Sequence, residues 1–486
     1  MKSCTIIITD EVNCKIKGLE VSDSRKLMRM FEHEVPYARH LPSFKLGRWN
    51  GKVAFFQLGG STYLNLLPEI VPKLDEWGYD IQLDDQRTHS FEIKFNEITE
   101  DTFSHITWPK GHPLAGEPIK FRDYQLERIN TFLANPQSVQ EIATGAGKTL
   151  ITAALSYSCE SMGRTIVIVP NKSLVTQTEA DYINIGLDVG VYFGDRKEWN
   201  KTHTICTWQS LNNLLKATKD GTAECTIQDF IEGVVCVMID EAHMGKADVI
   251  KTLLTSVMAH MPIRWGLTGT IPKEKFESEA LRVSLGEVVG KLSAHELQAQ
   301  GVLAQCHVNI LQLDDQVDFA NYQSELKFLL DNKDRLDIIA QKISEIALSG
   351  NTLILIDRIN AGKELVARLG ERAAFVSGNT KDEDRKEHYG EVADVDDKIL
   401  VATYGVAAVG LNIPRLFNVV LIEPGKSFVR VIQSIGRGLR KAEDKDFVQI
   451  WDVTSTCKFA KRHLTKRKQF YKDAQYPFEI EKIYYR

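Results

Sequence analysis

The chain has 486 residues, of which 43% are hydrophobic and 26% are charged, the proportions of an ordinary globular protein. Its formal net charge of −5 shows no overall preference for a polyanionic partner, so any nucleic-acid surface must come from local basic patches. The length is too great for one hydrophobic core and predicts about three or four domains.

The spacing of the cysteines and the lengths of the hydrophobic runs indicate the cellular compartment of the protein. The eight cysteines form no CxxC pair and show no zinc-ligand spacing, so we expect reduced core residues. The N-terminus lacks a signal-peptide pattern, and no apolar run approaches the ~20 residues of a membrane helix. The sequence therefore predicts a cytoplasmic protein with no membrane partner.

The first part of the chain, residues 1–105, predicts a small α+β domain. A segment rich in Pro and Gly, from Trp108 to Pro118, predicts the linker that follows it. Strands are expected over Cys4–Thr9, Val12–Lys17, Val53–Leu58, Tyr63–Leu67 and Tyr79–Leu83, and helices over Ser22–Val35 and Pro68–Trp77.

Short β-branched runs that alternate with helical stretches predict two successive α/β domains, residues 106–290 and 291–455. Apolar strands of this kind form parallel sheets that are covered on both faces, and about 150 residues suits each domain. Residues 456–486 are expected to form a short, basic, helical extension. The strands are expected over Thr165–Val169, His203–Thr207, Val234–Ile239, Trp265–Thr268, Val308–Leu311, Leu353–Ile356, Ala373–Val376, Ile399–Ala402, Val419–Ile422 and Val448–Trp451.

A candidate phosphate-binding loop (P-loop) occupies Ala143–Thr149. It follows an apolar lead-in and precedes the helical run Leu150–Ser158, the strand–loop–helix context that the motif requires. The strict GxxxxGK[ST] pattern has glycine where this chain has Ile142, so the loop taken alone leaves an ordinary loop before a helix as the alternative.

Each residue type in this loop has a role in holding ATP and Mg²⁺. Gly145 and Gly147 let backbone N–H groups approach the phosphates at the positive end of the helix. Lys148 would reach the β- and γ-phosphates, and the Thr149 hydroxyl would hold Mg²⁺. The candidate nucleotide-binding residues of the loop are Thr144, Gly145, Ala146, Gly147, Lys148 and Thr149.

Two acidic residues follow the apolar strand Val234–Ile239. A carboxylate at the end of a buried strand beside a P-loop can hold Mg²⁺ through water, and a second one can polarise the attacking water. We assign Asp240 to the metal and Glu241 to the water. A solvated acidic pair that opens a helix is the alternative for this segment alone.

Two arginines, Arg437 and Arg440, lie in the segment Gln433–Arg440. Their spacing places both guanidinium groups on one helical face, and such permanently charged planar donors suit the charge that develops on a γ-phosphate. Taken alone, the pair also fits a solvated basic helix.

The order of these segments resembles the motif series of superfamily 2 helicases, over about residues 118 to 455. The resemblance implies two RecA-like domains with ATP in the cleft between them. The ordered segments are Gln125, Ala143–Thr149, Asp240–His243, Thr268–Thr270, Thr403 with Gly410, and Gln433–Arg440. The catalytic residues that it implies are Lys148, Asp240, Glu241, Gln433, Arg437 and Arg440.

The same resemblance assigns further residues. Arg122 and Gln125 lie in a segment similar to the adenine-reading motif, in which Gln125 would bond the base. His243, Thr268 and Thr270 resemble residues that couple hydrolysis to strand movement.

In the fifth motif of the family, Thr403 would contact the strand and Gly410 would approach the nucleotide. Many members carry Asp where this chain has Asn412, which puts a charged role there in doubt. The nucleic-acid contacts that the resemblance implies in the two RecA-like domains are Asn171, Lys172, Thr207, Arg358 and Thr403.

Two basic stretches outside these motifs are further nucleic-acid candidates. The C-terminal one suits a duplex backbone or an RNA strand, and a solvated helix is the alternative. The N-terminal one mixes basic and aromatic residues that could stack bases or wedge a junction, although Phe44 and Trp49 could equally fill the domain's own core. The candidates are Lys461, Arg462, Lys466 and Arg467 in the first, and Lys45, Arg48 and Trp49 in the second.

The combined motifs predict an ATP-dependent motor on nucleic acid. Gly266–Thr270 and the short C-terminal tail look more like DNA translocases of the fork-remodelling and restriction-motor kind than like RNA-processing helicases. We therefore expect a helicase that acts on single-stranded and branched DNA, with RNA–DNA hybrids as further substrates, and a single-strand-binding or recombination protein as a partner. The alternatives are an RNA helicase, the motor subunit of a restriction nuclease, and a clamp that uses ATP only as a switch.

Overall fold

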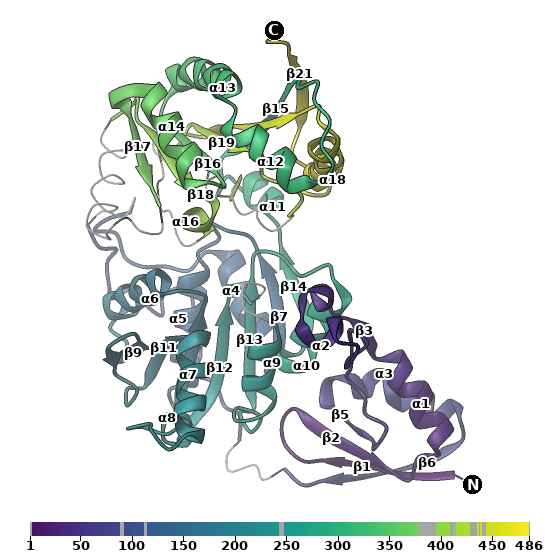
Figure 1. The fold of residues 1–486 in the computed structure, drawn as a ribbon. Helices are drawn as coiled ribbons and strands as arrows, with labels where there is room; N and C mark the ends of the chain where they lie inside the picture. The colour runs from purple at the N-terminus through teal and green to yellow at the C-terminus, as the bar shows by residue number, and fades with distance from the viewer. Residues whose placement is uncertain are drawn as a thin grey trace. The chain divides into compact units, whose positions relative to one another are not determined.

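The computed structural model describes residues 2–87, 92–110, 114–242, 247–377, 380, 395–408, 413, 415–427, 435–436, 438–439 and 444–485. The chain divides into two compact units (Figure 1). Unit 1 comprises Met1–Ile142 and Gly147–Lys291, and unit 2 comprises Ala143–Ala146 and Leu292–Arg486. In these described ranges, no helix is both long and apolar enough to cross a bilayer. The domain boundaries expected from the sequence remain predictions.

Unit 1 begins with a four-stranded sheet in the order β5-β2-β1-β6. The first two strands, both expected from the sequence, pair as an antiparallel hairpin, and β6 pairs in parallel with β1. The elements are β1 (Lys2–Ile8), β2 (Asn13–Lys17), β5 (Ser61–Tyr63), β6 (Tyr79–Asp85), α1 (Val21–Met30) and α3 (Leu67–Glu76).

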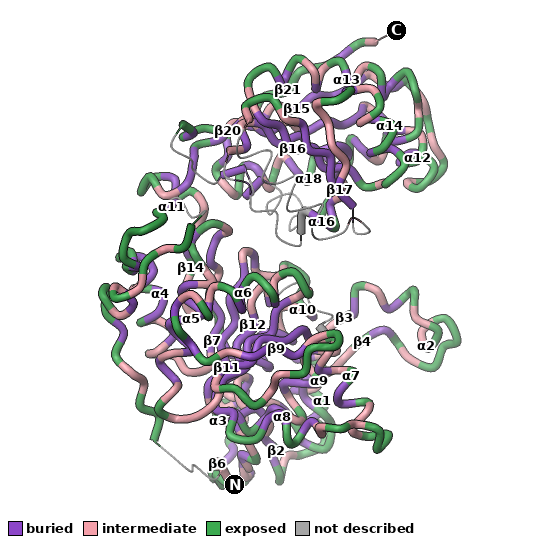
Figure 2. The backbone as a smooth tube through the Cα atoms, turned by 90° about the vertical axis from the view of Figure 1, so that its left-hand side faces the viewer, coloured by how far each residue is buried: buried purple, intermediate pink, exposed green. Residues whose placement is uncertain are grey.

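A small two-stranded ribbon follows α1. The helix expected over Ser22–Val35 ends at Met30, and β3 (Glu32–Glu34) then pairs with β4 (Lys52–Ala54). The connection between the two strands contains the short helix α2 (Pro42–Lys45), which has no buried residue (Figure 2).

The core of this N-terminal part is shared with the first α/β domain. Phe31, Phe55 and other buried residues of the N-terminal part form one hydrophobic cluster with Phe276 and Val283 of α10 (Lys275–Leu285). The rings of Phe55 and Phe276 lie 6.0 Å apart. The small domain therefore does not have a hydrophobic core that is separate from the rest of unit 1.

The rest of unit 1 is an eight-stranded sheet in the order β10-β9-β11-β8-β12-β13-β7-β14. The strands from β9 to β7 are parallel, as predicted, and β10 runs antiparallel to β9. The strands are β7 (Gln137–Ile142), β8 (Arg164–Val169), β9 (Val189–Phe193), β10 (Arg196–Lys197), β11 (His203–Thr207), β12 (Val234–Asp240), β13 (Ile263–Thr268) and β14 (Glu287–Leu292).

Helices pack against both faces of this sheet. One face carries the hydrophobic cluster to which α7, α8, α9 and α10 contribute, and α4, α5 and α6 pack on one another and on β7, β8 and β12. The helices are α4 (Asp123–Ala134), α5 (Lys148–Cys159), α6 (Lys172–Ile185), α7 (Trp208–Lys219), α8 (Ile227–Ile231) and α9 (Ala247–Thr255).

Unit 2 contains a seven-stranded sheet in the order β17-β18-β16-β19-β20-β15-β21, in which every neighbouring pair is parallel. The six strands predicted here are confirmed. The C-terminal extension is not purely helical, because β21 follows its helix and pairs with β15. The strands are β15 (Gln305–Leu313), β16 (Thr352–Ile356), β17 (Ala373–Val376), β18 (Ile399–Thr403), β19 (Asn418–Ile422), β20 (Phe447–Ser455) and β21 (Phe478–Ile483).

The helices of unit 2 bury the two faces of this sheet. Leu326, Ile339 and Leu365, on α12, α13 and α14, lie in one hydrophobic cluster with alternate residues of the strands, and α16 and α18 contact β18 and β20. The described helices are α11 (Ala294–Ala299), α12 (Tyr322–Asp331), α13 (Lys333–Ile346), α14 (Ile359–Leu369), α16 (Tyr404–Ala408) and α18 (Lys458–Asp473). All eight cysteines of the chain are unpaired.

Candidate ATP site and nucleic-acid contacts

The carboxyl edge of the first large sheet brings most of the expected positions of unit 1 together. The carboxyl ends of neighbouring parallel strands meet at one edge of a sheet, where open α/β folds bind their ligands. In spatial order, Thr207 ends β11, Asn171 follows β8, Asp240 ends β12, Thr268 ends β13, and the P-loop follows β7.

The P-loop has the backbone that its glycines predict. Gly145 and Gly147 have φ angles of 89° and 81°, a left-handed region that glycine enters without steric cost. Gly147 is also the N-cap of α5, which begins at Lys148. The loop therefore leads directly into a helix N-terminus, where unpaired backbone N–H groups attract an anion.

Gln125 lies against the P-loop. A Cβ placed on Gly147 would come within 2.5 Å of the Gln125 Nε2 atom. The Gln125 Oε1 atom accepts a hydrogen bond at 2.9 Å from the backbone N–H of Arg122, the N-cap residue of α4. A side chain at Gly147 would therefore have to displace the Gln125 amide. The adenine contact assigned to Arg122 and Gln125 stays a prediction.

Lys148 and Glu241 form an ion pair. The Lys148 Nζ and Glu241 Oε1 atoms are 2.5 Å apart, and both side chains are largely buried, with 10% and 14% of their surface exposed. Glu241 has a φ angle of 53°, unusual for a residue with a side chain. Its Oε2 atom accepts the Gly269 backbone N–H at 3.3 Å, so Glu241 joins the P-loop lysine to the Thr268–Thr270 segment.

Asp240 is the last residue of β12, and its Oδ1 atom accepts the Glu241 backbone N–H at 2.9 Å. Burial raises the pKa of its carboxyl to about 6, although the positive charge of Lys148 opposes the shift. The neighbouring Thr268 hydroxyl donates to the Thr270 carbonyl at 2.7 Å. Among the described residues, the buried Thr270 Oγ1 atom has no hydrogen-bond partner. The two threonines thus form a tight turn beside the acidic pair.

Two of the nucleic-acid candidates in unit 1 have structural roles. The Asn171 side chain accepts the Leu174 N–H at 3.0 Å and caps α6, and the Thr207 hydroxyl accepts the Ser210 N–H at 3.2 Å and caps α7. Thr207 is also buried. The neighbouring Lys172 is exposed, so it is the more accessible candidate at this edge.

In unit 2, Arg358 and Thr403 share the corresponding edge of the second sheet. Thr403 ends β18, and Arg358 follows the adjacent strand β16. Arg358 forms an exposed ion pair with Asp331 at 3.3 Å, which a phosphate could replace at little cost. Six residues of the expected motifs lie outside the described residues: His243, Gly410, Asn412, Gln433, Arg437 and Arg440.

Arg467 does not belong with the exposed basic residues of α18. Its guanidinium is buried and bidentate on Asp452 at 2.8 and 3.0 Å, and it donates to the Gly425 carbonyl at 2.7 Å. The helix period explains the difference, because Leu464, Arg467 and Tyr471 lie on its buried face. We therefore withdraw Arg467 as a nucleic-acid contact. Lys461, Arg462 and Lys466 are exposed.

The candidates of the N-terminal basic stretch also differ in how exposed their side chains are. The Trp49 ring packs against the shared core and donates from Nε1 to the Lys52 carbonyl at 2.8 Å, so its side chain fills the domain core as the alternative reading had it. Lys45 and Arg48 are exposed beside Leu46, which is 64% exposed. Only these two basic residues remain accessible candidates in the connection between β3 and β4.

A buried charge network in unit 2 was not expected from the sequence. Arg335 donates to Asp315 at 3.1 Å and to Glu423 at 2.6 Å, and all three side chains are buried. Glu423 follows β19 and has a φ angle of 44°. Burial raises the pKa of Glu423 to about 7 against the effect of Arg335. The sequence signal that could have revealed this network is an acidic residue directly after an apolar strand, the same arrangement that drew attention to Asp240.

Comparisons with known proteins agree with these motifs. The chain matches the family "Type III restriction enzyme, res subunit" over residues 118–273 and the "Helicase conserved C-terminal domain" family over residues 334–442. The chain belongs to the superfamily 2 helicases and is an ATP-dependent nucleic-acid helicase, as its motif order indicated.

One relative matches nearly the whole chain. The ATP-dependent DNA helicase uvsW of Enterobacteria phage T4 is 24% identical over 472 residues, which are 93% of this chain and 90% of that protein. The DNA 3'-5' helicase XPB of Mycobacterium tuberculosis is 24% identical over 80% of this chain and 70% of its own length. The protein-level resemblance to the UvsW helicase, which the N-terminal part and the motifs together indicate, is therefore confirmed.

Solved structures show the same fold. The helicase MrfA bound to DNA has a TM-score of 0.58 and is 14% identical, with 82% of this chain and 54% of that chain covered. The Type ISP restriction-modification enzyme LlaBIII bound to DNA has a TM-score of 0.55 and is 15% identical, with 95% and 39% covered. At these identities the likeness concerns the fold alone.

Proposed function

We propose that the protein is an ATP-dependent DNA helicase or translocase that unwinds or branch-migrates forks, four-way junctions and R-loops in recombination, repair and replication restart. The observation that carries the proposal is the match to the DNA helicase uvsW over 93% of the chain, which includes the N-terminal part that the two helicase families leave out. Exposed Lys45 and Arg48 in that part are the candidate contacts for selecting branched substrates.

The ATP site supports the motor role through the chemistry of its side chains. The Thr149 hydroxyl and the Asp240 carboxylate offer oxygen ligands, which Mg²⁺ prefers, usually together with phosphate oxygens and water. Bound there, Mg²⁺ would neutralise phosphate charge. Among the described residues, no group of three or more His, Cys, Asp or Glu side chains could hold a metal ion by itself.

We assign Lys148 to the β- and γ-phosphates and Glu241 to the attacking water. On their motif positions, Gln433, Arg437 and Arg440 are assigned to the γ-phosphate, and His243, Thr268 and Thr270 to coupling. Because Gly269 donates its N–H to Glu241, a change in the carboxylate reaches the coupling segment through one hydrogen bond. This connection supports a motor rather than a clamp that uses ATP only as a switch.

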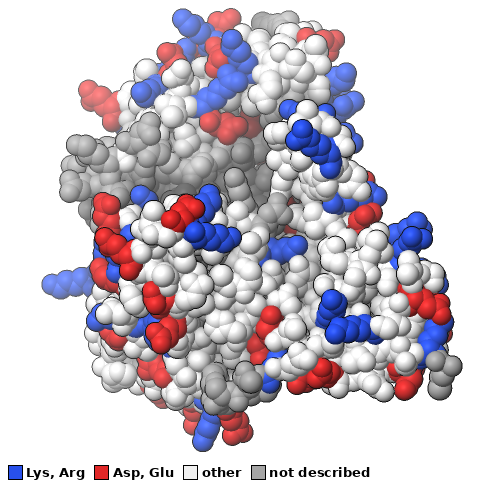
Figure 3. Space-filling model, turned by 60° about the horizontal axis from the view of Figure 1, so that its bottom comes forward, with Lys and Arg blue, Asp and Glu red and all other residues white. Residues whose placement is uncertain are grey.

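Strand contacts are proposed through phosphates rather than bases, because contacts with the backbone carry no sequence information and a motor must move over any sequence. The candidates are Lys172, which is exposed, and Arg358 and Thr403, which lie at the carboxyl edge of the second sheet. Acidic and basic side chains are interspersed over the face seen in Figure 3, which agrees with strand contacts made by local basic groups. The likeness to a bacteriophage protein supports the cytoplasm of a bacterial host as the location and a single-strand-binding or recombination protein as a partner.

The decisive test is an ATPase and unwinding assay that compares single-stranded DNA, single-stranded RNA, a fork, a four-way junction and an R-loop. The proposal expects the strongest stimulation and strand separation with branched DNA. Stimulation by RNA but not DNA would establish the RNA helicase alternative. Translocation on duplex DNA without strand separation would establish a restriction-type motor.

A further inference from the structure

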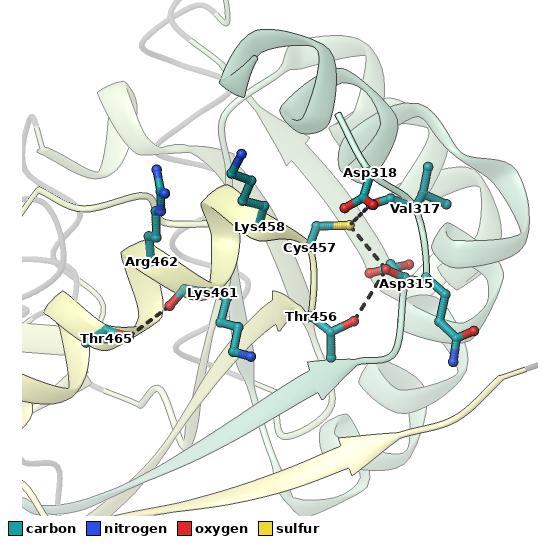
Figure 4. A pocket seen from close by; sticks show the side chains of 10 residues that line it. Asp315, Val317, Asp318, Thr456, Cys457, Lys458, Lys461, Arg462 and Thr465 are labelled. Atoms are coloured by element: carbon teal, nitrogen blue, oxygen red, sulfur yellow. Dashed lines mark hydrogen bonds between the residues drawn. The ribbon is translucent and has the colours of Figure 1, made fainter. Parts of the chain in front are cut away.

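A pocket of about 760 Å³ lies at the carboxyl edge of the second sheet, between the loop that follows β15 and the first turns of α18. Figure 4 shows Lys458, Lys461 and Arg462 projecting from α18 and Cys457 pointing toward the loop. We call it the α18 pocket. Its lining residues are Asp315, Gln316, Val317, Asp318, Thr456, Cys457, Lys458, Lys461, Arg462 and Thr465.

The wall of the pocket is fixed by hydrogen bonds. The Cys457 thiol donates to the carbonyls of Asp315 and Val317, both at 3.3 Å. The Thr456 hydroxyl donates to Asp314 at 3.2 Å. The loop is thus tied to the end of β20, so a ligand would meet a largely preformed hollow and little ordering would oppose binding.

The pocket attracts anions through its side chains. The buried Asp315 carboxylate is already engaged by Arg335 at 3.1 Å and by the Tyr485 hydroxyl. The first N–H groups of α18 do not contribute, because Phe459 and Ala460 donate theirs to the buried Glu325 carboxylate at 3.0 and 2.6 Å. Asp318 is then the one exposed acid of the lining, against three exposed cationic side chains.

The pocket continues a line of basic groups along the edge of the sheet. Arg358 follows β16, the exposed Lys426 lies in the turn after β19, and Lys458 opens α18 directly after β20. These are neighbouring parallel strands. With strands ~4.8 Å apart, the line from β16 to β20 covers roughly 10 Å, a length that a few nucleotides of one strand can span.

The electrostatic environment beside the pocket is positive. His463 lies one residue beyond Arg462 on α18, and burial together with the charges of Arg467, Lys426 and Lys466 lowers its pKa to about 4. Because Lys426 belongs to the turn after β19, this effect indicates that a charge of the sheet edge lies near α18. The edge of the sheet and the helix therefore present their positive charges to one region.

We propose that the α18 pocket is a subsite for single-stranded nucleic acid, which extends the strand path past Arg358 and accommodates one nucleotide. The inference rests on the proposed function and deepens it. Phosphates would contact Lys458, Lys461 and Arg462, and the base would enter the hollow above Thr456. The volume lies in the ~300–1,000 Å³ range of sites that hold small molecules, whereas phosphate contacts alone need no hollow.

The polar lining fits a base without selecting one. Gln316 and Asp318 on the loop and Thr456 on the floor present both donors and acceptors, so each base finds a partner after a small rotation of a side chain. A subsite of this kind serves a motor that passes every sequence. It would also distinguish an unpaired strand from a duplex, because a paired base cannot leave its stack to enter the hollow without an energetic cost of a few kcal/mol.

The test measures binding of the full-length protein to oligothymidylates of increasing length without ATP, by fluorescence anisotropy at several salt concentrations. In the wild type, affinity should rise when nucleotides are added at one end until the pocket is filled. In the double variant K461A/R462A, this gain in affinity should be at least threefold smaller. The slope of log K against log salt should also be smaller in magnitude by about 1.4. The control K472A/K482A removes two exposed charges of unit 2 outside the pocket and should keep the length dependence.

The variant Thr465→Leu keeps every charge and fills part of the hollow from the exposed face of α18, so it should also lose the gain with length without unfolding. Equal length dependence in the wild type, the pocket variants and the control would overturn the subsite. That result can be told apart from a failure of the proposed function, in which the wild-type protein would not unwind branched DNA at all.

Discussion

The side chains of Lys148 and Glu241 form an ion pair, with Nζ and Oε1 2.5 Å apart. The group assigned to phosphate and the group assigned to water thus neutralise each other. Glu241 is held from its other oxygen by the Gly269 N–H. If Lys148 turned to a phosphate, Glu241 Oε1 would lose this cationic partner, and the carboxylate would become a better acceptor for water. We therefore propose that one lysine links nucleotide binding to the activation of water by Glu241.

Replacement of Glu241 by glutamine should separate nucleotide binding from hydrolysis. The amide keeps the shape but cannot act as a base, so kcat for ATP should fall by roughly 10²–10⁴-fold. Nucleotide affinity should be equal or higher, because Lys148 no longer has an anionic partner. Steady-state ATPase rates and titration with a fluorescent nucleotide give both numbers. Lys148→Ala, the comparison variant, should lose affinity and turnover together, and weaker nucleotide binding by E241Q would contradict the linkage.

An alanine at Gly147 should damage the P-loop. The φ angle of 81° and the Gln125 Nε2 atom 2.5 Å from an added Cβ both oppose a side chain, and the backbone term alone costs about 1–2 kcal/mol. Nucleotide affinity should drop at least tenfold. The matched control is Gly59→Ala, where an added Cβ meets nothing within 4 Å. Similar nucleotide affinities for the two variants would show that the loop tolerates a different backbone.

The parallel sheets and the edge that carries the ATP motifs could be predicted from the sequence. Continuous apolar strands such as Val234–Ile239 are a local signal, and the acids that follow them mark the carboxyl end. β21 was missed because the strand is mostly exposed, and its order depends on its pairing with the distant strand β15.

Side-chain roles that depend on distant partners could not be predicted. Arg467 stands among lysines in the sequence, and its burial depends on Asp452, fifteen positions earlier on another element. Trp49 lies in a segment whose basic and aromatic composition is typical of a base-stacking loop, yet its ring contacts a core that includes residues of α10. Composition identifies a charged or aromatic segment, whereas the fold decides which of its residues face solvent.

Substrate selection by the N-terminal part should be tested with point variants rather than by deletion. Removal of residues 1–100 would expose Phe276 and Val283, which share the core with Phe55. We now expect the truncated protein to melt at a lower temperature. The double variant K45A/R48A changes exposed residues only. It should keep ATPase stimulation by single-stranded DNA and lose preference for forks, and an unchanged preference would exclude these two contacts.

Variants of Arg467 and Lys466 should have opposite effects, the first on stability and the second on nucleic-acid binding. Arg467→Met leaves the buried Asp452 carboxylate without its guanidinium, a change that typically costs about 3–5 kcal/mol. Its neighbour Lys466 is exposed, and Lys466→Ala should leave the melting temperature unchanged while it weakens DNA binding at low salt. Thermal denaturation and anisotropy compare the two. Weaker DNA binding by R467M at an unchanged melting temperature would return Arg467 to the candidate contacts.

Glu423 should make stability depend on pH. Two buried guanidiniums, of Arg335 and Arg467, meet three carboxylates, of Asp315, Glu423 and Asp452, so one negative charge is in excess. Burial raises the pKa of Glu423 from 4.5 to about 7, and the folded state then holds a proton that the unfolded state releases. The stabilisation from this proton is complete below pH 4.5 and is lost as the pH rises through about 7, at most ~3 kcal/mol.

The glutamine variant isolates this contribution. Glu423→Gln cannot titrate and keeps an oxygen for Arg335, so it should retain the fold and remove the decrease in stability between about pH 5 and 7. Denaturant unfolding of the wild type and the variant at four pH values measures the difference in free energy of unfolding. The two curves should lie close together at pH 5 and diverge toward pH 8, where the variant should be the more stable protein. Parallel curves over the whole range would show that Glu423 stays ionised beside Arg335.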